Sequence, residues 1–437
     1  MPKRRNALLL LAIMALTVLL AGCAASVSLP EETPQISVET PEPSPTLVPT
    51  PAPTPTPSPA PTPEPTPEEK PAYEAEAVPV TLHVDVDGRK DVHLLTDADY
   101  NTRLRLPENT EIFVQTEMAV KALYIIWETV PDACSVSAGS YTLECGENGF
   151  LHEYVELPEE VTDFKIDLPQ GGLLCDIYAY TDGRLPEYVQ IWEPSVDRAD
   201  ILLFPTHGDD ELLFFGSILP YYAGELGLSV QVVYLIDHAP ERPRQHEQLD
   251  GLWTVGVTAY PVFGKFADTY VRSINKALQF YNYYTVIEYQ VEMIRRFRPQ
   301  VIVDHDVRGE YGQGAHALNT ACMKEAVELA ADETYDRGDS LEKYGVWDTP
   351  KFYIHLLQEN NISLDYDQPL ERFGGRTAYE MAVEGYDRHQ SQQQWSFYVY
   401  TKDAAYDCSS FGLYRSTVGE DVAKNDLMEN LTPYGEQ

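Results

Sequence analysis

One short stretch, residues 199–216, reads ADILLFPTHGDDELLFFG and constrains the fold more than any other part of the chain. Its apolar start, residues 201–205, is typical of a strand buried on both faces of a parallel sheet. A second apolar run, residues 212–222, predicts a helix. Such a strand, turn and helix bring polar side chains to the carboxyl edge of an open α/β sheet, where these folds bind ligands. The turn between the two apolar runs carries four of them: His207, Asp209, Asp210 and Glu211.

Strands and helices continue to alternate after this stretch. Apolar runs predict further core strands at residues 230–236 and 301–303. Amphipathic or apolar segments predict helices at residues 242–257, 281–298 and 316–331. The alternation predicts an α/β domain over residues 197–437, with a Rossmann-like, doubly wound and mostly parallel sheet.

Residues 73–196 show a different pattern. Short runs of alternating polarity are separated by Asp, Gly, Pro and Asn turns, which predicts an all-β sandwich. The pieces LLTDADYNTR and ALYIIW within it resemble discoidin-like (galactose-binding-like) jelly rolls. The resemblance implies a module that targets glycans, whereas a structural sandwich that covers one side of the α/β domain explains the pattern equally well.

The first 72 residues predict export and anchoring. A basic start, MPKRRN, precedes the apolar run ALLLLAIMALTVLL, which is short for a membrane-spanning helix and favours a signal peptide over residues 1–22. The run ends in Leu-Ala-Gly-Cys, which resembles the bacterial lipobox and implies that Cys23 is lipidated. Residues 23–72 are proline-rich and predict a disordered but extended stalk. We therefore expect an extracytoplasmic protein that is lipid-anchored to the bacterial cell membrane.

Charge and cysteine content narrow the partners further. The formal net charge of −38 disfavours nucleic acid and anionic lipid headgroups as partners of the folded part. The cysteines after Cys23 lack the CxxC spacing of a structural zinc site. Cys134 and Cys145 flank a predicted hairpin, where a disulfide and two buried thiols are equally compatible with the sequence.

The polar turn after the first core strand offers the groups of a hydrolytic zinc site. Such a site uses about three His or carboxylate ligands, an open position for water and a base close to that water. His207, Asp209 and Asp210 supply two ligands and a base from one corner of the chain. His316 is the best candidate for the third ligand, because it also follows a core strand and returns to the same sheet edge.

Four motifs carry a family resemblance. HGDDE, RPRQHEQLDGLWTVGV, RPQVIVDHDVRGEYGQGAH and DRHQSQ resemble, in order and spacing, the PIG-L (LmbE-like) family of zinc-dependent de-N-acetylases. The resemblance extends from about residue 200 to at least residue 431. Gly208 stands where the family has a proline, which removes no ligand. Carried over by position, the resemblance implies a general base and three ligands for zinc or another divalent metal: Asp209, then His207, Asp210 and His316.

Other positions are less determined by this resemblance. Gln313 replaces the first histidine of the family's HxxH motif, which is thought to polarise the carbonyl; an amide still donates a hydrogen bond but carries no charge. His305 and His389 each fit a catalytic, a positioning or a structural role. Arg244 and Glu247 are predicted to pair with one another and brace the site.

The sequence therefore predicts a surface lipoprotein with a zinc-dependent N-deacetylase domain. Its expected substrate is an N-acetylglucosamine-type amino sugar in a glycan or glycoconjugate outside the cytoplasm. The alternative is a glycan-binding lipoprotein with weak or lost catalysis. Gln313 supports this alternative, and the intact set of ligand residues argues against it.

Overall fold

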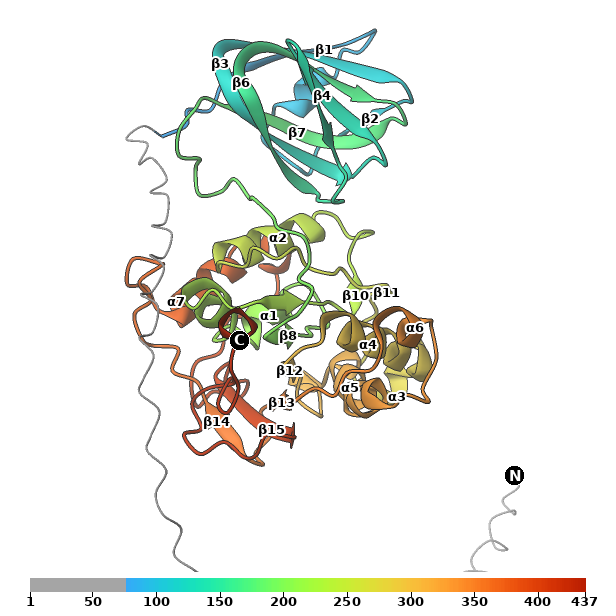
Figure 1. Ribbon diagram of the computed structural model, residues 1–437, viewed down its shortest axis with the longest axis vertical. Helices are drawn as coiled ribbons and strands as arrows, with labels where there is room; N and C mark the ends of the chain where they lie inside the picture. The colour runs from blue at the N-terminus through green and yellow to red at the C-terminus, as the bar shows by residue number, and fades with distance from the viewer. Residues whose placement is uncertain (1–75) are drawn as a thin grey trace, which may run out of the picture. The chain divides into compact units, whose positions relative to one another are not determined.

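The computed structural model describes residues 76–437, which belong to one compact unit, Glu69–Gln437. The predicted signal peptide, the lipidation site Cys23 and the proline-rich stalk lie outside the described residues, so they stay predictions. Among the helices of residues 76–437, none combines the length and the apolar character needed to cross a membrane. The chain has a mixed α/β fold with two large sheets (Figure 1).

The first sheet is antiparallel and has seven strands in the order β2-β7-β3-β6-β4-β5, with β1 paired to β3. Along β3 buried and exposed residues alternate at first and then give way to a continuous buried run, residues 122–127, because the alternate side chains of that run enter two different apolar clusters. The all-β pattern is thus present, and the finer jelly-roll arrangement stays a prediction. The strands, with one short helical turn η1 (Val92–Leu95), are β1 (Leu82–Val86), β2 (Leu104–Leu106), β3 (Thr110–Thr129), β4 (Cys134–Ala138), β5 (Tyr141–Cys145), β6 (His152–Leu168) and β7 (Gly172–Tyr180).

The sheet settles the question that the sequence left open about two cysteines. Cys134 and Cys145 lie directly opposite one another on β4 and β5, their Cα atoms are 5.2 Å apart, and they form a disulfide. Cys175, Cys322 and Cys408 are buried free thiols.

The second sheet has the order β14-β15-β13-β12-β8-β9. β9, β8, β12 and β13 run parallel to one another. At the β13 edge, β15 pairs antiparallel with β13, and β14 pairs antiparallel with β15. The strand predicted at 230–236 is interrupted in the structure: its first three residues form β9, and its last residue begins the separate strand β10. The bounds are β8 (Ile201–Leu203), β9 (Val230–Val232), β12 (Val301–Asp304), β13 (Lys351–His355), β14 (Asn361–Ser363) and β15 (Ser410–Ser416), with a separate parallel pair of β10 (Ile236–Asp237) and β11 (Phe266–Ala267).

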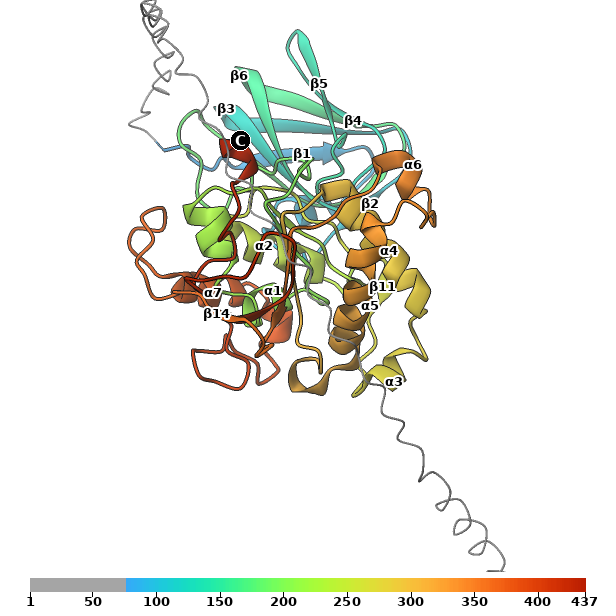
Figure 2. The same cartoon turned by 60° about the horizontal axis from the view of Figure 1, so that its bottom comes forward.

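Helices lie on both faces of this second sheet. Alternate residues of β8 enter two different cores: Ile201 and Leu203 pack with residues of α2 and α7, and Leu202 packs with residues of α4 and α5. Figures 1 and 2 show α4 and α5 side by side. The Rossmann-like detail of the connections stays a prediction. The longer helices are α2 (Arg244–Thr254), α4 (Tyr283–Phe297), α5 (Gly314–Ala331) and α7 (Ala378–Tyr386), and the shorter ones are α1 (Asp210–Leu213), η2 (Leu219–Glu225), α3 (Ile274–Ala277), η3 (Glu310–Gly312), α6 (Ser340–Tyr344), η4 (Gln390–Gln392) and η5 (Tyr434–Glu436).

One predicted helix differs from the structure. Residues 212–222 were expected as one helix, but α1 ends after a single turn and the π-helical turn η2 follows. The chain packs tightly between the two: a Cβ atom at Gly216 would lie 2.7 Å from the Cβ of Ala382 on α7. Pro220 also lacks the backbone N–H that a continuing helix would use. Tertiary packing therefore overrides the local apolar pattern here.

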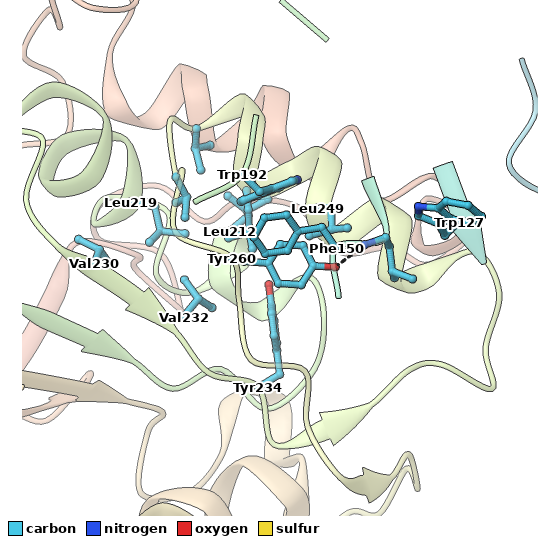
Figure 3. Packing of buried hydrophobic residues seen from close by; sticks show 14 of the residues in the cluster. Trp127, Phe150, Trp192, Leu212, Leu219, Val230, Val232, Tyr234, Leu249 and Tyr260 are labelled. Atoms are coloured by element: carbon cyan, nitrogen blue, oxygen red, sulfur yellow. Dashed lines mark hydrogen bonds between the residues drawn. The ribbon is translucent and has the colours of Figure 1, made fainter. Parts of the chain in front are cut away.

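A continuous apolar cluster joins the first sheet to the second. Figure 3 shows Trp127 and Phe150 from the first part of the chain, followed by Trp192 and Tyr260, and then by side chains around β9 and α2. The hydroxyl of Tyr260 accepts a hydrogen bond of 2.9 Å from the backbone N–H of Leu151. The two sheets thus share buried surface within one compact unit.

Candidate active site

The carboxyl ends of two neighbouring parallel strands position the candidate site. β8 and β12 pair in register at Leu203 and Val303, so the segments that leave them start side by side. The chain after β8 carries His207 and enters α1 at Asp210, and the chain after β12 passes through η3 into the first turn of α5, which carries His316. The structure therefore brings His207 and Asp210, which share one turn, together with His316, which lies more than a hundred positions further along the chain.

The three side chains converge to a triangle of ligand atoms, which we call the first cluster. The Nδ1 atom of His207 lies 3.0 Å from the Nε2 atom of His316 and 3.2 Å from the Oδ2 atom of Asp210. The Nε2 atom of His316 lies 3.3 Å from the same oxygen, and all three residues are buried. Tetrahedral zinc with bonds of 2.0–2.1 Å separates its ligand atoms by roughly 3.3–3.4 Å, so this donor set fits a zinc ion.

Glu310 fixes the orientation of one of these histidines. Its buried carboxylate accepts 2.8 Å hydrogen bonds from the Nδ1 atoms of His316 and His305, and a 2.6 Å bond from the Nδ1 atom of His355. Burial would raise the pKa of Glu310, but the surrounding histidines outweigh that effect and hold the pKa well below its usual range. The bond to Nδ1 leaves the lone pair of His316 Nε2 facing the first cluster.

Asp209 lies beside the first cluster in an unusual backbone conformation. Its φ angle is +155°, and its N–H donates a 2.8 Å hydrogen bond to the Oε2 atom of Glu211. Backbone of this kind costs about 1–3 kcal/mol and persists only where surrounding contacts impose it. Burial raises the pKa of the Asp209 carboxyl to about 7, although the guanidinium of Arg244, 3.8 Å away, acts in the opposite direction. A carboxyl group of this kind can exchange a proton with water or substrate near neutral pH.

Arg244 and Glu247 brace the site but do not pair with one another as predicted. The Nη2 atom of Arg244 donates a 2.8 Å hydrogen bond to the carbonyl of Gly208. Glu247 accepts hydrogen bonds of 2.7 Å and 2.5 Å from the N–H and the hydroxyl of Ser391. Both residues are on α2, so this helix connects the turn after β8 with the segment around η4.

The remaining candidates occupy different positions. His305 bonds to protein through both ring nitrogens, since its Nε2 atom accepts the N–H of Thr206 at 2.9 Å. His389 is buried with its Nε2 atom 3.0 Å from the Oε1 atom of Glu211. Burial lowers its pKa, but the Glu211 and Asp209 carboxylates raise it more, so the pKa lies above the usual value. Gln313 caps α5, because its Oε1 atom accepts the N–H of Ala315 at 3.2 Å.

Sequence reasoning missed four residues that complete the surroundings of the site. Asp268 lies 3.6 Å from the Nε2 atom of His207 and 3.5 Å from Arg244. His238 accepts the N–H of Gly208 at 3.1 Å, and its position directly after a predicted strand was a usable signal. Glu310 belongs to the GEYG loop before His316, where its charge could have been noticed. No local signal points to His355 or to Asp268.

Comparison with known proteins adds evidence from sequence. No family model matches the chain. Residues of this chain are 33% identical over 94 residues to 1D-myo-inositol 2-acetamido-2-deoxy-alpha-D-glucopyranoside deacetylase 1 of Catenulispora acidiphila. They are also 33% identical over 72 residues to 1D-myo-inositol 2-acetamido-2-deoxy-alpha-D-glucopyranoside deacetylase of Rhodococcus erythropolis. Both relatives are deacetylases.

The matched segments are short. They cover 22% and 16% of this chain and 27% and 23% of the two relatives, so the chain spans about a quarter of their length. Among solved structures, N,N'-diacetylchitobiose deacetylase from Pyrococcus horikoshii is similar at 15% identity and a TM-score of 0.36, over 47% of this chain and 72% of that one. The sequence similarity thus connects part of this chain with sugar deacetylases.

Proposed function

We propose that this chain is a zinc-dependent N-deacetylase of the PIG-L (LmbE-like) type. The observation that carries the proposal is the convergence of His207, Asp210 and His316 on one point, with the Asp209 carboxyl beside them. The sequence similarity to two deacetylases of an acetamido sugar supports the same reaction. In this proposal the three converging residues hold the metal and Asp209 is the general base.

The reaction is hydrolysis of an acetamide C–N bond. A bound zinc ion supplies a Lewis acid for the acetyl carbonyl and lowers the pKa of water. Asp209 accepts the proton that the attacking water loses as the new C–O bond forms. When the C–N bond breaks, a proton reaches the departing nitrogen from Asp209 or from His389, and the products are acetate and a free amine.

The surrounding residues keep these groups in place. Arg244 holds the backbone carbonyl between His207 and Asp209 and lies next to the base. Glu310 fixes the tautomer of His316, so that its free nitrogen is directed to the metal position. Gln313 uses its oxygen to cap α5, so only its amide nitrogen is left to donate to the substrate carbonyl.

The substrate that we propose is an N-acetylglucosamine-type amino sugar in a glycan or glycoconjugate. Its location follows from the predicted signal peptide and lipobox, because a protein anchored at Cys23 outside the cytoplasm meets wall or exogenous glycans rather than cytoplasmic metabolites. In this proposal residues 197–437 are the deacetylase domain and residues 73–196 are an accessory β domain. Zinc is the expected metal, and another divalent ion would use the same ligands.

The decisive experiment measures zinc content and acetate release for Glu69–Gln437, the compact unit. Chitooligosaccharides and peptidoglycan fragments are the substrates. Loss of a general base costs about 10²–10⁴-fold in rate, so Asp209→Asn should bind zinc and release acetate at least a hundredfold more slowly than wild type. Asp237→Asn, which changes a carboxylate at the end of β10, is the matched control and should match wild type.

Two outcomes would contradict parts of the proposal. Bound zinc without acetate release from any N-acetylated substrate would favour the alternative, a glycan-binding lipoprotein with weak or lost catalysis. Absence of metal after reconstitution with zinc would refute the assignment of the ligands themselves.

A further inference from the structure

A cavity lies apart from the residues that form the candidate active site. Its volume is about 750 Å³, which is in the range of small-molecule sites in proteins. Three segments line it: the connection between β7 and β8, the last turns of α2 and the region around α7. The residues used below are Tyr188, Trp253, Arg372, Arg376, Glu384 and Arg388.

The loop that carries two of the arginines has a fixed shape. The carboxylate of Glu225 accepts the N–H of Arg372 at 2.9 Å, and the N–H of Leu370 donates to the carbonyl of Arg376 at 2.9 Å. The ring of Phe373 packs so closely on Gly224 that a Cβ atom there would lie 2.6 Å from it. Contacts on both sides thus hold the loop, and it presents Arg372 and Arg376 to the cavity.

The positive and negative side chains that line the cavity are equal in number, although the chain as a whole has a formal net charge of −38. Glu384 pairs with Arg376 and with Arg388. Asp250 accepts hydrogen bonds from Tyr100 and from Gln190. Besides these three arginines and two acids, only Glu187 adds a charge. A lining with equal numbers of positive and negative groups favours a ligand without net charge that both donates and accepts hydrogen bonds.

Among the described residues, two charged side chains of this cavity, those of Arg372 and Glu187, have no hydrogen-bond or ion-pair partner. Within the part of the chain that the structure describes, the guanidinium of Arg372 makes no hydrogen bond and no ion pair. It is therefore available to a ligand, whereas the other two arginines are already held by Glu384. A guanidinium offers five N–H donors, which suits the oxygen atoms of a polyhydroxylated molecule.

Aromatic side chains provide the apolar part of the surface. Tyr188 is 55% exposed, and the indole N–H of Trp253 donates to the carbonyl of Glu187 at 2.8 Å, which fixes that ring beside it. Flat rings next to charged donors and acceptors match a pyranose, which has an apolar C–H face and a rim of hydroxyl groups.

We propose that this cavity is a second, non-catalytic binding site for a neutral oligosaccharide. α2 connects it to the candidate active site, because Arg244 in the first turn lies beside Asp209 and Trp253 in the last turn lines the cavity. Over the length of α2 the two places are on the order of 15 Å apart. A glycan held in the cavity would keep its neighbouring units close to the active site, and this coupling to turnover rests on the function proposed above.

Binding of chitotetraose tests the site independently of catalysis. The Asp209→Asn form of Glu69–Gln437 serves as the parent, so that no ligand is consumed, and the dissociation constant is measured by calorimetry. Tyr188→Ala and Arg372→Ala should each weaken binding at least about fivefold, since a stacked ring or a charged hydrogen bond contributes about 1 kcal/mol or more. Tyr284→Ala is the matched control, because Tyr284 is 62% exposed on α4, away from the cavity, and should leave binding unchanged.

A second readout separates this inference from the proposed function. In the background with Asp209 intact, the Tyr188 and Arg372 variants should lower kcat/KM for chitotetraose and leave that for diacetylchitobiose unchanged. If these variants lose binding but the wild type releases no acetate, the cavity is supported as a binding site and the proposed hydrolase activity is contradicted. Unchanged binding in both variants, or no binding of chitotetraose by the parent, would overturn the cavity site whatever the hydrolase does.

Discussion

Two clusters in this molecule each bring ligand-type atoms together, yet they differ in the spacing of those atoms and in the charges around them. In each, three such atoms lie within 4.8 Å of one another. The first cluster joins the ends of β8 and β12. The second cluster joins the antiparallel sheet to α2. Their members are His207, Asp210 and His316 in the first, and Glu128, Cys175 and His246 in the second.

Two arginines pair with the carboxylate of the second cluster, whereas further carboxylates lie next to the histidines of the first. Arg242 lies 2.5 Å and Arg103 lies 3.4 Å from the carboxylate of Glu128. Burial, reinforced by nearby carboxylates, raises the pKa of the Cys175 thiol to about 12, so this group stays protonated at neutral pH and is a poor ligand. The first cluster instead has the carboxylates of Glu310 and Asp268 close to its histidines. The donor atoms of the second cluster are also further apart, 3.8 Å from Glu128 to His246 and 3.9 Å from Glu128 to Cys175, so spacing, protonation and neighbouring charge all favour the first cluster for a metal ion.

The largest expected difference is in zinc content. His316→Ala removes one ligand of the first cluster, and we expect zinc bound per chain to fall from about one to nearly none. His246→Ala removes the histidine of the second cluster and should leave zinc content unchanged. Metal analysis after dialysis distinguishes the two variants, and zinc lost from the His246 variant alone would reverse the comparison.

A smaller effect on zinc binding is expected from Glu310, whose carboxylate hydrogen-bonds to the ligand His316. Glu310→Gln keeps the shape of the side chain but removes the charge that holds His316, His305 and His355. Loss of such a partner typically weakens metal binding by about 10–100-fold. Competition with a chelator of known affinity measures the change. Glu128→Gln is the matched control from the second cluster, and equal zinc affinities in the two variants would contradict the role of Glu310.

The same control variant should instead affect folding. The carboxylate of Glu128 forms ion pairs with Arg242 and Arg103 and lies 3.8 Å from the Nε2 atom of His246 on α2, so it joins the antiparallel sheet to that helix. We expect Glu128→Gln to lower the free energy of unfolding by roughly 1–2 kcal/mol, since Arg242 is partly exposed and water compensates part of the loss. Urea denaturation at pH 7 measures this, and an unchanged midpoint would show that the contact is not a stabilising one.

The first cluster could be predicted from the sequence in part, and the contacts around it could not. His207, Asp209 and Asp210 share one turn, and the rule that parallel strands end at the same sheet edge added His316, so the first cluster was predictable. Glu310 contacts three histidines that come from different elements, and only the assembled fold shows them together. The predicted pair of Arg244 and Glu247 failed for the same reason, because each found a partner outside its own helix.

For the fold as well, features set by local sequence were predicted, and features set by long-range packing were not. The ranges predicted for α2, α4 and α5 agree with the structure to within a few residues, because their apolar periodicity is local. The helix expected at 212–222 ends early, since its course depends on the close packing of Gly216 against Ala382 on α7. The second cluster has no sequence signal at all, because its three residues come from β3, β7 and α2.

The smallest predicted effect concerns the residue next to Cys175. Asp176 is buried, and only its Oδ1 atom has a hydrogen bond, 3.0 Å from the N–H of Ala98. Burial raises the pKa of Asp176 to about 6, and Asp97 and Asp99 act in the same direction. Because the pKa is higher in the folded than in the unfolded protein, the ionised form destabilises the fold. That cost is absent below about pH 4, grows as the pH rises to about 6 and is then constant.

Asp176→Asn removes this dependence and can still accept the N–H of Ala98. The variant should match wild type at pH 4 and exceed its unfolding free energy by about 1 kcal/mol at pH 7.5, less than the full shift implies because the new amide NH2 is itself buried without a partner. Urea denaturation of both proteins at the two pH values tests this. A difference of the same size at both values would mean that ionisation of this carboxyl is not what destabilises the strand. A difference that appears only at pH 7.5 would show that the ionised carboxylate of Asp176 is costly in its buried position beside the second cluster.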